Sequence, residues 1–551
     1  MARRWSGVPD RRPVGARTVW AALLLIAPAM ALVRALRSGW QPEGDDATIV
    51  LRAREFFHGE LPLQGMRSTA GGGDPSLANH HLGPLELHLL MPASWSGSGW
   101  AVALTCVLVA AGCSLAVAHW AHRIGGDPGL IVFGSGVLVL QWAIGPDAMF
   151  RPYNPYIGLL PVYLALVLLT AHLRRLPGVG WPLVLTTGLI AQANLAFAPI
   201  GLGIAAWCLG VTATRLAREH PGLRAWRTHL RARPVQVPQA TLVTACVALL
   251  VWAPVLAEPL RHDPGNLGQL LKAFLADTPS QGPAWALSRV GLMAPVPGGF
   301  RTLGLTLVYG TTAFAQGAGW VLLAVLVMGA LPVGLARRRP IAAVPARAAV
   351  IGMGLTLTTL MMLPTHGLAN HYLAAVIPTA IFSWAAVTWW ALLHWSEVRR
   401  RLATWQSLRI AAAASVIAAV LALVAPMSDA TGPDLGKRAS DLVTSSTSDL
   451  PAGSHVEIYG SGFLAAMSTA PAVALGLERH GLRAHYLHPW PTSEDAGRLA
   501  RTTAPSGSTQ VFLIGGDVEN RTPPAGAQRI GTVRDGPEQF VDVYLVLGSG
   551  S

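Results

Sequence analysis

Long apolar stretches, separated by short polar segments, dominate residues 1–427 of this 551-residue chain. Each stretch is close to the roughly 20 residues that an α-helix needs to cross the ~30 Å hydrocarbon core of a bilayer. The pattern therefore predicts a membrane protein with many spans. The clearest apolar runs are residues 19–36, 101–118, 130–144, 157–171, 242–257, 320–336, 348–363, 372–393 and 410–426.

Arginine-rich segments alternate with these runs, and they predict a topology. Cytoplasmic loops of membrane proteins carry an excess of Lys and Arg. The basic segments are residues 3–17, 119–123, 172–175, 215–233, 337–347 and 394–409. If all of them lie on the cytoplasmic side, the chain crosses the membrane about eleven times and residues 428–551 lie outside. The spans are then 18–37, 99–119, 128–146, 156–172, 181–195, 197–214, 240–257, 315–336, 343–363, 370–393 and 409–427.

Two apolar segments need special treatment in this topology. Residues 81–95 should not cross, because an extra span would place every later basic loop outside; we expect a juxtamembrane or re-entrant helix. Residues 185–208 must break near Gln192-Ala193-Asn194, with Pro199 just after, so that two short helices meet at the outer side.

After residue 427 the pattern changes to that of a small α/β domain. Strands are predicted at 455–459, 483–487, 510–514 and 540–547, with helices at 465–480 and 493–501 between them. Residues 429–449 are rich in Ser, Thr, Asp and Gly, which is typical of a flexible tether. We therefore expect two domains. These are a membrane module, residues 1–427 with a first outer loop at 38–98, and an extracytoplasmic domain, residues 428–551.

Composition supports the membrane class and excludes a nucleic-acid-binding protein. The chain is 52% hydrophobic and only 13% charged, whereas about 25% of the residues of a soluble domain are charged. Its net charge of +13 comes from short clusters between apolar runs, not from one soluble face. Such clusters favour the anionic inner surface of a bilayer over nucleic acid. We expect a multi-pass protein of the cytoplasmic membrane, with membrane lipid as a partner.

The first candidate for chemistry is a pair of carboxylates, Asp45 and Asp46, shortly after the first span. Apolar residues recur at helical spacing over residues 47–57, which predicts a helix lying in the membrane interface. The two carboxylates are suited to act as a general base or to hold a divalent cation, Mg²⁺ or Mn²⁺. The alternative is that one of them caps the N-terminus of this helix.

Further polar residues cluster in the other outer loops. One group contains histidines and a carboxylate, which are suited to bind phosphate, sugar or metal. The spacing of these residues matches no known zinc-binding motif. Aromatic rings elsewhere suit stacking on a sugar, and arginine suits phosphate, although rings at this depth also form the ordinary interfacial belt. The residues in question are His80, His81 and Glu86; Arg151, Tyr153 and Asn154; Trp252, Arg261 and Asn266; and His366, His371 and Tyr372.

The order of these motifs resembles the GT-C superfamily of membrane glycosyltransferases. The resemblance covers residues 18–395 and rests on the Asp-Asp pair, the following helix, His-His-x-Gly-Pro-Leu at 80–85 and Asn-Pro-Tyr at 154–156. Within this superfamily, the sequence most resembles the dolichyl-phosphate-mannose protein mannosyltransferase-like group. Trp252-x-Pro254 and the Pro-Gly-Asn-Leu segment at 264–267 also resemble actinobacterial arabinosyltransferase-like proteins.

The resemblance implies an inverting enzyme that uses a polyprenyl-phosphate-linked sugar and a glycan, lipid or protein acceptor. It implies that Asp45, with Asp46 as the alternative, is the base that deprotonates the acceptor hydroxyl, and that the C-terminal domain covers the site or binds acceptor. Relatives often carry a Lys or a second Pro where this chain has residues 81–84. The family's phosphate-binding segment corresponds to His80, His81 and Glu86. Residue type and common sidedness add Arg151, Tyr153, Asn154, His371 and Tyr372 to the donor side, and give an acceptor-side or supporting role to Trp252, Arg261, Asn266 and His366.

Two other classes compete with this interpretation. A transporter or flippase of lipid-linked or envelope precursors would place ionisable residues at the bilayer midplane and usually shows internal repeats. The predicted spans carry few such residues and no evident repeat. A non-enzymatic envelope-assembly protein with the same scaffold is the third class, and the Asp pair argues against it.

Overall fold

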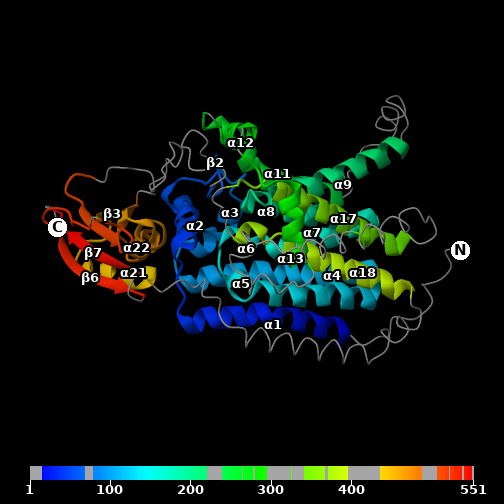
Figure 1. The fold of residues 1–551 in the computed structure, drawn as a ribbon, viewed down its shortest axis with the longest axis horizontal. Coiled ribbons are helices and arrows are strands. Elements are labelled where there is room, and N and C mark those ends of the chain that lie inside the picture. The colour runs from blue at the N-terminus through cyan, green and yellow to red at the C-terminus, as the bar shows by residue number, and fades with distance from the viewer. Residues whose placement is uncertain are drawn as a thin grey trace.

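The computed structural model describes residues 15–68, 79–219, 239–263, 265–276, 279–294, 324, 340–365, 370–394, 435–486, 505–519, 521–535 and 539–548. A bundle of long apolar helices lies beside a small C-terminal α/β domain (Figure 1). Short helices and strands, α2 and α3 among them, lie at the end of the bundle next to this domain, which we call the domain-facing end.

The bundle consists of helices that suit a bilayer. Within the described residues, seven helical segments are long and apolar enough to cross a membrane. The chain is therefore a multi-span helical membrane protein. The bundle helices are α1 (Gly15–Ser38), α4 (Gly99–Ile144), α7 (Leu159–Leu173), α8 (Gly180–Ala193), α9 (Ala198–Glu219), α11 (Gln239–Ala257), α17 (Pro340–Met361) and α18 (Val376–His394).

Helix α4 is a hairpin of two spans. Its 46 residues are interrupted by non-helical backbone at Gly125 and Gly126, and Gly126 has a φ of 64°, a conformation that favours glycine. The side chain of Gln141 donates to Ser114 Oγ at 3.0 Å, so the two halves lie side by side. They correspond to the predicted spans at 99–119 and 128–146.

The remaining spans compare with the sequence as follows. The break predicted near Gln192-Ala193-Asn194 is confirmed, since α8 ends at Ala193 and α9 begins at Ala198. The spans predicted at 315–336 and 409–427 fall almost entirely outside the described residues. Every other predicted span coincides with a helix, while the total of about eleven and the sidedness stay predictions.

Short elements surround the domain-facing end. Helix α3 has 10 residues, about 15 Å of helix, which is too short to cross a bilayer, as expected for residues 81–95. The others at this end are α2 (Gly44–Arg54), η1 (Glu55–His58), the antiparallel pair β1 (Arg67–Ser68) and β2 (Asn79–His80), α3 (Leu85–Ser94), α5 (Asp147–Phe150), α6 (Asn154–Ile157), η3 (Glu258–Leu260), α12 (Asn266–Leu275) and η4 (Asn370–Leu373). Helix α13 (Gly282–Met293) packs against α17 and α18 within the bundle.

The C-terminal domain is a five-stranded mixed sheet of order β4-β3-β5-β7-β6. Strand β3 is parallel to β4 and β5, and β7 is antiparallel to β5 and β6. The predicted strands are confirmed, β6 was missed, and the predicted helix 493–501 lies outside the described residues. The elements are α21 (Leu435–Ser446), β3 (His455–Ser461), the π-helix η5 (Leu464–Thr469), α22 (Ala470–Arg479), β4 (Arg483–Tyr486), β5 (Thr509–Gly515), β6 (Gln528–Arg534) and β7 (Phe540–Val546).

The predicted tether at 429–449 is wrong for most of its length. Helix α21 occupies Leu435–Ser446, and Leu435, Ala439 and Val443 are buried against the domain. These residues recur every four positions, so one face of the helix is apolar. Of the Ser and Thr residues of α21, Ser445 and Ser446 are exposed, whereas Ser440 and Thr444 are half-buried.

Residues 47–57 were expected in the lipid interface; this expectation is wrong for α2, although Phe56 and Phe57 of η1 are exposed. Residues Asp46–Leu51 and Ala53 of α2 are buried. The apolar residues among them belong to one hydrophobic core that also contains α3, the start of α4, and the helices and sheet of the C-terminal domain. Protein, rather than lipid, covers the apolar side chains of α2. The domain is therefore packed into the membrane module and shares its core.

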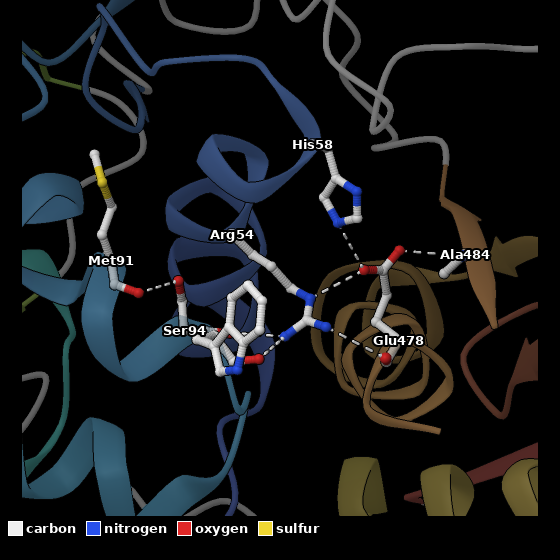
Figure 2. A network of polar contacts seen from close by, with 7 residues as sticks. Arg54, His58, Met91, Ser94, Glu478 and Ala484 are labelled. Atoms are coloured by element: carbon white, nitrogen blue, oxygen red, sulfur yellow. Dashed lines mark hydrogen bonds and ion pairs between the residues drawn. The ribbon is translucent and has the colours of Figure 1, made fainter. Parts of the chain in front are cut away.

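A network around Arg54 joins α2 to this domain (Figure 2). Arg54 Nε donates to Glu478 Oε2 of α22 at 3.1 Å, and His58 Nε2 lies 3.5 Å from the same oxygen. Arg54 Nη1 donates to the carbonyl oxygens of Ser94 and Trp95, both at 2.7 Å. The guanidinium of Arg54, which is mostly buried, thus fixes the end of α2 to α3 and to the C-terminal domain.

Candidate functional site

The candidate site begins at the first turn of α2. Gly44 opens the helix with a φ of 52°, and the residue at the N-cap is Glu43, which makes no side-chain capping bond. Asp45 and Asp46 follow inside the first turn, where a carboxylate is favoured by the helix dipole. The expectation that one of them is the helix cap is wrong, because the helix begins one residue earlier.

Asp46 is buried and forms an ion pair with an arginine side chain. Arg151, which follows α5, donates from Nε to Asp46 Oδ2 at 2.6 Å. Burial raises the pKa of Asp46, and the Arg151 guanidinium opposes that rise. Burial also disfavours charge on Arg151, but Asp46 outweighs it and raises the pKa of the guanidinium. Asp46 Oδ1 is buried and makes no hydrogen bond within the described part of the chain.

Unlike Asp46, Asp45 is exposed at the surface of the protein. The surrounding protein nevertheless leaves its carboxyl poorly hydrated, and this raises its pKa to about 6. The charge of Asp46 adds to the rise and that of Arg151 opposes it. Asp45 is therefore an accessible carboxyl whose pKa lies close to neutral pH, the range in which a general base works best.

Tyrosines lie around Asp45. Burial, followed by the charge of Asp45, raises the pKa of Tyr153, and Tyr372 adds to this effect. The rings of Tyr153 and Tyr156 meet edge to face with centroids 5.0 Å apart. Tyr486 of β4 also has a raised pKa, caused by burial and then by Asp45. The C-terminal domain therefore reaches the electrostatic surroundings of Asp45.

Glu86 is a second buried carboxyl near Asp46. Burial raises the pKa of Glu86 well above its usual value, and the charge of Asp46 raises it further. Its Oε1 atom makes no hydrogen bond within the described residues. These conditions favour the protonated form, in which the carboxyl can donate a hydrogen bond.

The His80–His81 strand is held by a cluster that we call the strand clasp, made of Gln64, Glu258 and Asn266. Asn266 Oδ1 accepts from the His80 N–H at 2.9 Å, and Asn266 Nδ2 donates to the carbonyl oxygens of His80 and His81 at 3.3 and 3.2 Å. Glu258 accepts from the Asn266 N–H at 3.0 Å and from Gln64 Nε2 at 2.8 Å. The three clasp residues are buried, and so are His80 and His81.

Polar contacts connect the strand clasp to the α2 site. His81 Nδ1 accepts from the N–H of Leu195 at 3.2 Å. The adjacent Asn194 donates from Nδ2 to Asn154 Oδ1 at 3.4 Å, and Asn154 begins α6, three residues after Arg151. Helix α6 also packs against η4, which carries Tyr372. The structure therefore gathers most of the predicted polar residues at the domain-facing end.

Other predicted residues lie elsewhere or cannot be placed. His366 falls outside the described residues, as does the side chain of His371. Arg261 is exposed after η3, and Trp252 is half-buried within α11. Within the described residues, neither side chain makes a hydrogen bond or ion pair with α2. Asn266 lies near the site, where its side chain binds the backbone of His80 and His81 and not their imidazole rings.

Sequence reasoning missed several residues that build the site. Glu258 and Gln64 complete the strand clasp, and Tyr486 comes from a distant domain. Gln192 donates to the carbonyl oxygen of Val251 at 2.9 Å and accepts from the Leu85 N–H at 3.2 Å. A polar side chain inside an apolar run, as at Gln192, is the one signal that pointed to such a role.

The described residues do not form an evident metal centre. Among them, no group of three or more His, Cys, Asp or Glu side chains is arranged to hold a metal ion. One oxygen of Asp46 is already bonded to Arg151. A divalent cation at the Asp pair is thus supported by the two carboxylates alone.

Comparison with known proteins finds a similarity to solved structures alone. No protein-family model and no curated protein matches the chain. Among solved structures, the chain is similar to the crystal structure of ArnT from Cupriavidus metallidurans in the apo state. The similarity covers 96% of this chain and 97% of that chain, with 13% sequence identity and a TM-score of 0.48. At these values it assigns neither an activity nor a residue role.

Proposed function

We propose that the chain is a membrane glycosyltransferase of the GT-C type that transfers a sugar from a polyprenyl phosphate to an acceptor hydroxyl. The observation that carries the proposal is Asp45. It is an accessible carboxyl with a pKa of about 6, placed at one end of a membrane-spanning helix bundle. Lipid-linked substrates keep their chain in the bilayer and their phosphate at its surface, so their chemistry requires reactive groups at such an end.

The proposed reaction is a single displacement. Asp45 accepts the proton of the acceptor hydroxyl while the hydroxyl oxygen attacks the anomeric carbon. A new carbon–oxygen bond forms, the bond from the anomeric carbon to the phosphate oxygen breaks, and polyprenyl phosphate leaves with the electron pair. Attack opposite the leaving group inverts the anomeric configuration. Asp46, fixed by Arg151, raises the basicity of Asp45 through its charge.

The donor is proposed to lie between α2 and the strand clasp. Arg151 carries guanidinium donors suited to a phosphate. Protonated Glu86 would supply a further hydrogen-bond donor, and the tyrosines at 153 and 372 would stack on the sugar. His80, His81, Asn154 and His371 complete the donor side of the proposal. The acceptor is a glycan, a lipid or a protein, and the site faces the extracytoplasmic side of the cytoplasmic membrane.

The test is transfer by the purified protein in lipid nanodiscs. Each member of a panel of polyprenyl-phosphate sugars is combined with glycan, lipid and peptide acceptors, and the release of polyprenyl phosphate is measured. We expect release with one donor class in the wild-type protein and its loss in Asp45→Asn. Addition of EDTA tests whether Mg²⁺ or Mn²⁺ takes part. No release with any combination would contradict the proposal.

The transporter or flippase alternative predicts a different outcome of the same experiment. A transporter would move the lipid-linked sugar across a liposome membrane and leave its glycosyl bond intact. The buried carboxyls Asp46 and Glu86 lie on short helices outside the candidate spans. Because transporters bind substrates near the midplane, this placement favours the enzyme.

A further inference from the structure

Helix α12 has two faces of opposite character. Its first residue, Asn266, is buried in the strand clasp. Leu267, Leu271, Phe274 and Leu275 are exposed by 40%, 57%, 66% and 71% of their surface. Their spacing of four, three and one places them on one side of the helix. No described part of the protein covers this side.

The apolar face of α12 continues a lipid-facing surface. Helix α11, which η3 joins to α12, is a candidate span in which only Val251 and Val255 are buried. Leu249, Leu250 and Leu256 of α11 and Leu260 of η3 are among its exposed residues. In a span these side chains contact lipid. Figure 1 shows α12 standing out from the side of the bundle beyond the end of α11, at the domain-facing end.

We propose that α12 is a membrane-surface helix whose apolar face, Leu267, Leu271, Phe274 and Leu275, is inserted among the lipid chains. The surface of α11 and that of α12 then form one continuous contact with the bilayer. Lys272 lies at the edge of the apolar face and is exposed. A lysine in this position extends its ammonium group toward the lipid headgroups. The apolar face and the lysine at its edge are both typical of a helix at a lipid surface.

The insertion of α12 has a consequence for the site. Asn266 begins α12 and binds the backbone of His80 and His81 through three hydrogen bonds. A helix held at the lipid surface therefore holds the histidine strand at the same depth. If the proposed function is correct, α12 sets the depth at which the donor phosphate is met; only this consequence rests on the proposed function.

Nitroxide labels measure the insertion without any assay of activity. Single cysteines replace Leu271, Phe274 or Lys272 in the full chain after its four native cysteines are changed to alanine, and the protein is placed in liposomes of phosphatidylethanolamine and phosphatidylglycerol. Power saturation then compares collisions of each label with oxygen, which concentrates in lipid, and with a water-soluble nickel chelate. We expect oxygen to dominate at 271 and 274, and nickel at 272.

Two results would overturn the proposal. Nickel dominating at 271 and 274 would place the face in water, and low access of both reagents would show that protein covers it. If a cysteine at 271 or 274 prevents folding, labels at 267 and 275 report on the same face. A protein with the expected pattern and no glycosyl transfer would contradict the proposed function alone, so the two failures are distinguishable.

Discussion

The start of α2 and the strand clasp are both groups of buried or partly buried polar residues, but they differ in how their polar atoms are used. In the clasp, Glu258 and Asn266 direct their side chains to other protein groups. The backbone of the His80–His81 strand is bonded to Asn266 and to the backbone of Gly65 and Met66. At α2, Asp45 is open and poorly hydrated, and one oxygen of Asp46 makes no hydrogen bond in the described residues.

This difference separates a structural role from a chemical one. A buried polar group that is fully bonded stabilises one conformation. A carboxyl with a raised pKa and incomplete bonding retains a free-energy cost, which persists in proteins mainly where function requires it. The two regions should therefore respond in opposite ways to substitution.

The largest expected effect is on catalysis. Asp45→Asn should reduce the transfer rate by about 10²–10⁴-fold, the usual contribution of a general base. Thermal stability should be unchanged or slightly higher, because Asn removes a poorly hydrated charge. Transfer rate and melting temperature in nanodiscs measure the two effects. Asp46→Asn should cost less activity; the reverse order would make Asp46 the base.

The strand clasp should show the opposite pattern. Glu258→Ala leaves the Asn266 N–H and the amide of Gln64 without their acceptor, and each buried unsatisfied donor costs about 1–3 kcal/mol. We expect a lower melting temperature, measured by differential scanning fluorimetry in nanodiscs, with a smaller loss of transfer rate than in Asp45→Asn. The exposed Arg261→Ala is a matched control from the same loop. Unchanged stability in Glu258→Ala would show that the clasp is not structural.

The contact between α2 and the C-terminal domain should give a smaller effect. Glu478→Gln removes the charge and leaves one acceptor oxygen in place of the two that now accept from Arg54 and from the Ala484 N–H. We expect this to cost on the order of 1 kcal/mol. Hydrogen exchange of the α2 amides should become faster, and transfer should fall several-fold. Glu519→Gln, at an exposed position of the same domain, is the control. Equal exchange in both variants would mean that the Arg54–Glu478 contact does not hold α2.

Much of the membrane module was predictable from the sequence, because span length and apolar runs are local properties. The break at 194–197 followed from a polar interruption in a long run. The surroundings of α2 were not predictable in this way. Its apolar residues fitted a lipid interface, and the domain that covers them begins almost 400 residues later in the chain.

The candidate site was predictable in its residue types but not in their division of labour. The carboxylate pair after the first span was evident from the sequence. That Asp46 binds Arg151 and leaves Asp45 accessible depends on a contact between residues 105 positions apart. Likewise, the role of Asn266 depends on Glu258 and on a strand 186 positions away.

The pH dependence of transfer tests the central claim, that Asp45 is the base, most directly. The base must be deprotonated, so kcat/KM should rise with pH around a midpoint near 6, the pKa of Asp45, and at pH 5 should be about tenfold below its plateau. In Asp46→Asn the charge that raises this pKa is removed, and the midpoint should move to lower pH. A wild-type midpoint near 4, or one that does not move in Asp46→Asn, would contradict the assignment of Asp45 as the base.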